Sequence, residues 1–167
     1  MFRTCVGAVV LAVSMQALAD ESAYPTNQCI ESLRYDDRLA AIADKVALAR
    51  SDQTNADMFA LDRSAVAPEQ RALALWSKLR QFCFDLGADF RRELPNQEQA
   101  ALAGRLFDLQ QRMIDELREG GSTYATFNQR RVEVYQIAAS LEAQILERGE
   151  MVTSPESPVL PAGHSEI

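Results

Sequence analysis

Cysteine is the residue type in this chain with the clearest chemical role. The chain has three cysteines, and two of them, Cys29 and Cys83, lie in its main body. These two are far apart in sequence, whereas a redox-active pair normally places its thiols close together. An even number of cysteines in an exported chain is typical of a structural disulfide. We therefore expect one intramolecular bond between Cys29 and Cys83, with a structural role.

The segment 1–19 decides whether such a bond can form. Arg3 gives a positive start, residues 6–13 form a short apolar run, and residues 17–19 match the small-x-small pattern of a cleavage site. A membrane anchor is the alternative, but a span needs about 20 apolar residues. We expect a signal peptide that is cleaved after Ala19, a periplasmic or secreted product, and loss of Cys5 with the leader.

The only histidine, His164, stands near the end of the sequence. The main body therefore has no histidine for a nucleophile triad, an axial haem ligand or a paired-histidine zinc site. Paired carboxylates can act as acid and base only in a cleft that desolvates one of them, and in an acidic chain we expect them on solvated faces. The pairs are Asp36 with Asp37, Asp85 with Asp89, and Asp115 with Glu116. We expect no catalytic, cofactor-binding or metal-binding residues.

The charge balance bears on the partner. The chain has 17 basic and 24 acidic residues, a net charge of −7, and cleavage of the leader would remove one basic residue more. This balance disfavours nucleic acid and anionic lipid as the main partner. We expect a protein or another envelope component as partner, and no stable membrane span after the leader is removed.

Apolar residues at helical spacing predict the elements that must position these groups. Residues 27–50 are expected to form a first helix with a bend at Asp36-Asp37, where an aspartate could cap a new start. Residues 51–55 are expected to form a loop and 56–61 a short helix with Met58, Phe59 and Leu61 inward. The predicted apolar stripe of the first helix consists of Tyr35, Leu39, Ile42, Val46 and Ala49.

Pro68 followed by Glu69 predicts the start of the second long helix, which would end at Pro95. Its predicted buried stripe consists of Trp76, Leu79, Cys83, Leu86, Phe90 and Leu94. Since Cys83 lies on this stripe, the disulfide would join the first two helices at their buried faces. Gly87 and Gly104, both inside predicted helices, are interpreted either as close helix approaches or as tolerated surface defects.

Asn96 is expected to cap a third helix that ends at Gly120-Gly121, and Ser122 or Thr123 to open a fourth that ends at Gly149. Arg131 is the one charged residue on the apolar stripe of this last helix. It must find a carboxylate or backbone carbonyls, or direct its guanidinium out of the bundle. We favour the outward or ion-paired arrangement over contact with a ligand, for which Arg131 remains a candidate.

These elements predict an all-α protein with an antiparallel bundle of about four helices. The expected organisation is a signal peptide at 1–19, a helical domain at 20–149 and a disordered, proline-rich tail at 150–167.

Two resemblances add expectations about function. Tyr124, Phe127, Asn128 and Arg131 after a Gly-Gly pair, together with Trp76, Arg80 and Cys83, resemble small exported all-helical proteins of Gram-negative bacteria that have no assigned activity. This resemblance implies a periplasmic bundle without catalytic residues. A second, fainter similarity is to exported chorismate mutases, carried by Arg38-Leu39, Ala43 and Val46-Ala47. It implies Arg38 as a substrate-binding arginine, but Arg50 stands where a lysine is usual.

The function expected from these observations is that of a disulfide-stapled periplasmic binding protein without catalytic activity of its own. One alternative is a small-substrate enzyme of the mutase kind, with Arg38 and Arg131 converging on a cationic pocket. The other is a structural spacer, which would have no pocket.

Overall fold

The computed structural model describes residues 24–153, which form helices and turns with no β-strand among them. The all-α prediction is confirmed for this part of the chain. The predicted leader and residues 154–167 of the predicted tail lie outside the described residues. The α-helices are α1 (Pro25–Ser32), α2 (Ala56–Ala60), α3 (Ala67–Leu86), α4 (Ala88–Arg92), α5 (Gln97–Arg118) and α6 (Tyr124–Thr153). Single 3-10 turns span Leu33–Tyr35, Asp37–Leu39 and Ser51–Gln53.

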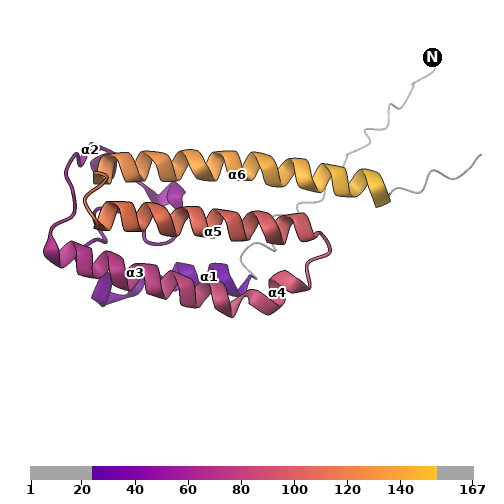
Figure 1. Cartoon of the computed structure of the whole chain (residues 1–167), viewed down its shortest axis with the longest axis horizontal. Helices are drawn as coiled ribbons and strands as arrows, with labels where there is room; N and C mark the ends of the chain where they lie inside the picture. The colour runs from indigo at the N-terminus through magenta and orange to yellow at the C-terminus, as the bar shows by residue number, and fades with distance from the viewer. Residues whose placement is uncertain (1–23, 154–167) are drawn as a thin grey trace, which may run out of the picture.

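Three of these helices are long, and they run side by side. Figure 1 shows α5 between α3 and α6, with α1 beside α3, and α6 extending past its neighbours at its carboxyl end. The short α2 packs against α6. The shared core is formed by apolar side chains of the segment that follows α1 and of the three long helices. It includes Leu39, Ile42, Val46, Leu73, Trp76, Ile114, Leu117, Tyr124 and Phe127.

Both predicted ends of the third long helix are confirmed, and each depends on a residue suited to a helix end. The Asn96 side chain accepts a hydrogen bond from the Glu98 N–H at 2.9 Å and caps α5. Gly120, with φ of 82°, lets the chain leave α5 in a conformation that other residues rarely adopt. The prediction that the last helix ends at Gly149 is wrong, since α6 continues to Thr153. A glycine inside a helix costs about 1 kcal/mol but does not by itself stop it.

The prediction of a long first helix over 27–50 is wrong beyond α1. The bend is where it was expected: the Asp36 side chain accepts a hydrogen bond from the Arg38 N–H at 3.0 Å and starts a new 3-10 turn. After Leu39 the chain forms successive turns, and residues 46–50 have no regular structure. The apolar spacing nevertheless identified buried residues, except Tyr35, which is 77% exposed. Those buried are Leu39, Ile42, Val46 and Ala49.

The sulfur atoms of Cys29 and Cys83 lie 2.00 Å apart, at disulfide bonding distance, with 5.3 Å between the Cα atoms. Cys29 is on α1 and Cys83 is on the buried face of α3. The predicted cross-link between the first helix and the next long helix is therefore present.

The second long helix is interrupted at Gly87, and its predicted buried stripe ends there. Trp76 and Cys83 are buried as expected, but Leu86 is 55% exposed and Phe90 is 37% exposed. Phe59, predicted to face inward from the short helix, is also exposed. Phe90 is covered only in part, by the Tyr24 ring at the start of α1.

Gly87 marks a close approach, whereas Gly104 does not. A Cβ atom at Gly87 would lie 2.0 Å from Thr26 Oγ1 and 2.9 Å from Arg91 Nη1. No atom lies within 4 Å of a Cβ atom at Gly104, in the middle of α5. The close-approach interpretation therefore holds for Gly87 only.

We predict opposite effects for alanine at these two glycines. Gly87→Ala should lower the free energy of unfolding by about 1–3 kcal/mol, because Thr26 and Arg91 must move away. Gly104→Ala should raise it by about 0.5–1 kcal/mol, because alanine favours the helix and meets no neighbour. Urea unfolding of both variants would check this, and a stabilised Gly87→Ala protein would contradict the close contact.

Candidate functional site

The irregular segment 45–49 is held by side chains that donate to its backbone carbonyls. The Asn128 amide donates to the Lys45 carbonyl at 2.8 Å, and the Trp76 indole N–H donates to the Leu48 carbonyl at 3.0 Å. Arg131 donates to the carbonyls of Ala47 and Ala49, the latter at 2.6 Å. A buried segment without regular structure needs such partners, because an unpaired buried carbonyl costs about 1–3 kcal/mol.

Arg131 is one of two arginines buried in this core. It is only 1% exposed, and no carboxylate among the described residues pairs with it. Burial and the nearby charge of Arg80 lower its pKa. The favoured prediction for Arg131, an outward or ion-paired guanidinium, is therefore wrong. Backbone carbonyls bind it, because residues 47–49 reach the core without pairing in a helix.

Arg80 is the second buried arginine, and sequence reasoning did not single it out as a site. Its guanidinium lies 5.3 Å from the Trp76 ring centroid, and that of Arg131 lies 5.4 Å from the same centroid. Arg80 donates to the Gln110 side-chain oxygen, whereas its Nε and Nη1 atoms have no hydrogen-bond partner. Burial lowers the pKa of Arg80. The signal was present, since Trp76, Arg80 and Cys83 share one helical face.

Tyr135 of α6 completes this cluster. Burial alone would raise the pKa of its hydroxyl, but the charges of Arg131 and Arg80 and hydrogen bonding with Gln110 and Arg80 lower it overall. The aromatic rings of Trp76 and Tyr135 thus surround two cations that have no carboxylate partner among the described residues. Contact with these aromatic rings and, for Arg131, with backbone carbonyls offsets part of the hydration that the two guanidiniums lose on burial.

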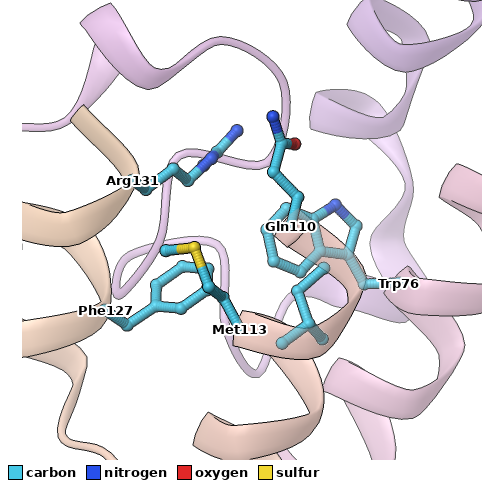
Figure 2. Close-up of a pocket in the computed structure, with 6 residues that line it drawn as sticks. Trp76, Gln110, Met113, Phe127 and Arg131 are labelled. Atoms are coloured by element: carbon cyan, nitrogen blue, oxygen red, sulfur yellow. The ribbon is translucent and has the colours of Figure 1, made fainter. Parts of the chain in front are cut away.

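The pocket beside Arg131 leaves no room for a water molecule. In Figure 2 the polar ends of Arg131 and Gln110 lie next to each other, above the side chains of Met113 and Phe127. These buried residues therefore have a structural role: they fix segment 45–49 against α3 and α6.

Arg38, the other candidate for ligand contact, lies elsewhere. Its guanidinium pairs with Asp36 at 2.6 Å, and its side chain is 64% exposed. The structure therefore does not bring Arg38 and Arg131 together, as a shared cationic pocket would require.

The predicted carboxylate pairs lie on accessible faces, except for Asp36, whose side chain is only 16% exposed. Each has local partners: Asp36 with Arg38, Asp89 with Arg92, Asp115 with Arg118, and Glu116 with Arg130. His164 lies outside the described residues.

Among the residues that the structure describes, Glu69 is the one buried carboxylate, and several groups donate hydrogen bonds to it. Arg63 donates to both of its oxygens, at 2.8 and 2.6 Å, and the Val66 N–H and the Tyr124 hydroxyl donate to it at 3.0 and 3.1 Å. The Arg63 hydrogen bonds are the largest influence and lower the pKa of Glu69 to about 2. Glu69 thus caps α3 and joins it to the start of α6.

A second pocket, open to solvent, is the candidate binding site. This cavity has a volume of about 180 Å³ and lies where α1, α3, α4, α5 and α6 meet; we call it the groove. The walls include Tyr24, Phe84, Leu94 and Ala103, with Arg91, Gln99 and Glu142 as charged or polar lining residues. No sequence pattern predicted it, because its walls come from segments that are adjacent only after folding.

Comparisons with family models, with curated proteins and with solved structures found no match to this chain. Within residues 24–153, no helix combines the length and the hydropathy that crossing a bilayer requires.

We predict that Arg131→Met will destabilise the protein by about 3–5 kcal/mol, because it strands two buried carbonyls. Arg130→Met is the matched control: Arg130 pairs with Glu116 at the surface, and its loss should cost at most about 1 kcal/mol. Urea unfolding gives both values. Amide exchange should also accelerate at residues 45–49 in Arg131→Met alone, and equal losses in the two variants would contradict this role.

We predict that protonation of Glu69 lowers the free energy of unfolding in acid. Its pKa in the folded protein, about 2, is below its ordinary value of 4.5, so its contribution is complete above pH 4.5 and disappears as the pH falls towards 2. Water reaches Arg63, so we expect this contribution to be about 1–2 kcal/mol.

The difference in unfolding free energy between wild type and Glu69→Gln should therefore shrink between pH 5 and about pH 2. Glu98→Gln, which removes a surface pair with Arg148, should show little change over the same range. A gap that stays constant with pH would contradict the assignment.

Proposed function

We propose that this protein is an exported, disulfide-linked helical bundle that binds another protein of the cell envelope and catalyses no reaction. The observation that carries the proposal is an apolar surface that leads into the groove. Phe82, Leu86 and Phe90 follow one another at intervals of four residues, and all three are exposed. The Phe90 ring contacts Tyr24, whose side chain lines the groove, with 4.2 Å between ring centroids.

Covering these three apolar side chains would favour association with a partner. Covering a large apolar side chain contributes about 1.5–3 kcal/mol, so the three side chains together offer several kcal/mol to a partner. Exposed apolar side chains are ordinary when they are single, but a continuous set beside a groove is typical of an interaction site.

The alternatives fit these residues less well. A mutase-like enzyme needs several cations around a cavity that holds the substrate, whereas the pocket at Arg131 is filled and Arg38 is on the surface. A structural spacer needs no groove. The binding proposal uses both the groove and the exposed side chains next to it.

Site-specific photo-cross-linking in cells that produce the chain tests the proposal. A photoreactive residue at position 86 should give a discrete adduct with one envelope protein, and the same residue at position 133, on exposed α6, should not. Ala103→Trp, which would fill the groove from α5, should reduce the adduct, and Ala101→Trp, on an exposed face of the same helix, should leave it. Equal cross-linking at both positions would contradict a defined site.

A further inference from the structure

The size of the groove limits what can enter it. Its volume is about 180 Å³, whereas sites for small-molecule ligands usually measure about 300–1,000 Å³. A cavity of about 150 Å³ holds one benzene molecule. The groove is therefore suited to a single aromatic or branched aliphatic side chain.

Arg91 adds a positive charge to the lining of this groove. The guanidinium lies over the Phe84 ring, 3.5 Å from its centroid, and donates to Thr26 Oγ1 at 3.1 Å and to the Phe84 carbonyl at 2.6 Å. These contacts hold it in place, and Gly87 provides the room for them. No carboxylate among the described residues forms an ion pair with Arg91, although its neighbour Arg92 pairs with Asp89.

Asp85 acts on Arg91 through its charge, but no salt bridge joins Arg91 to a carboxylate among the described residues. A guanidinium that is fixed and partly buried in this way is complementary to an incoming carboxylate. Glu142, from α6, also lines the groove. An anionic group would pair with Arg91, and the apolar group would contact the walls formed by Phe84, Leu94 and Ala103.

The occupant must also extend beyond the groove, because Phe82, Leu86 and Phe90 continue the apolar surface outside it. A polypeptide can cover such a surface while one of its side chains fills the cavity. We infer that the groove binds a segment of a partner protein through one apolar side chain, and that a carboxylate next to this side chain pairs with Arg91. This inference rests on the proposed function and names the chemistry that the partner must supply.

Short peptides test the inference directly on the oxidised full-length chain. The probes are two acetylated alanine pentapeptides that end in phenylalanine, one with a free carboxylate and one with an amide. In calorimetric titrations the free carboxylate should bind at least about tenfold more tightly, as expected for charge-assisted hydrogen bonds.

Variants of adjacent arginines supply the control. Arg91→Gln should abolish the difference between the two peptides, and Arg92→Gln should preserve it. Because Arg91 also joins α1 to α4, thermal unfolding must show that Arg91→Gln is folded. Arg91→Lys keeps the positive charge but lacks the two parallel N–H donors of a guanidinium. It should retain part of the preference for the peptide with a free carboxylate.

The other outcomes separate this inference from the proposed function. If both peptides bind equally and Ala103→Trp blocks both, the pairing of a partner carboxylate with Arg91 is contradicted, and the groove is an apolar binding site only. If neither peptide binds while the cross-link at position 86 persists, the inference fails alone; if the cross-link is also missing, both fail. Self-association that Ala103→Trp abolishes would show that a second copy of this chain is the occupant, and would overturn the assignment to a partner.

Discussion

The hydrogen bonds that reach the carbonyls of residues 45–49 are the constraint on which the rest of the structure depends. This segment enters the core without a helix or a sheet to pair its backbone, so side chains must do so. Trp76 supplies one donor from α3, and Asn128 and Arg131 supply the others from α6. The two helices are thereby fixed to the segment and, through it, to each other.

Burying two guanidiniums is a costly way to do this. Charged groups lose hydration when they enter a core, and here no carboxylate offsets that loss. Trp76 contributes a ring that both Arg80 and Arg131 contact, while Gln110 accepts a hydrogen bond from Arg80 and the carbonyls accept those of Arg131. The arginine fork suits this position because one side chain can reach two carbonyls, which a lysine cannot do in the same geometry.

The sequence predicted what local chemistry determines. The caps at Asn96 and Gly120, the bend at Asp36 and the disulfide all follow from residue type and spacing, and all are present. The prediction of a helix over 27–50 was wrong beyond α1 because apolar residues spaced by three or four fit a series of turns as well as a helix. Tertiary hydrogen bonds overrode the local preference there.

The candidate site was harder to predict. Leu86 and Phe90 continue the apolar spacing of α3, but whether another element covers them depends on how far α1 extends. The groove around Arg91 joins residues from five helices, and no sequence spacing encodes such a meeting. The residues of the first resemblance, in contrast, are buried contacts: Tyr124 binds Glu69, Phe127 packs against Trp76, and Asn128 binds residues 45 and 58. These residues hold the fold together, so the resemblance carries little information about a binding partner.

The donors from α6 have a consequence for synthesis. Arg131 follows the carbonyls that it binds by 82 and 84 positions, so a growing chain lacks them until most of the domain has left the ribosome. Contacts that span so much sequence form late. A nascent polypeptide of this kind cannot complete these hydrogen bonds until Arg131 itself has been synthesised.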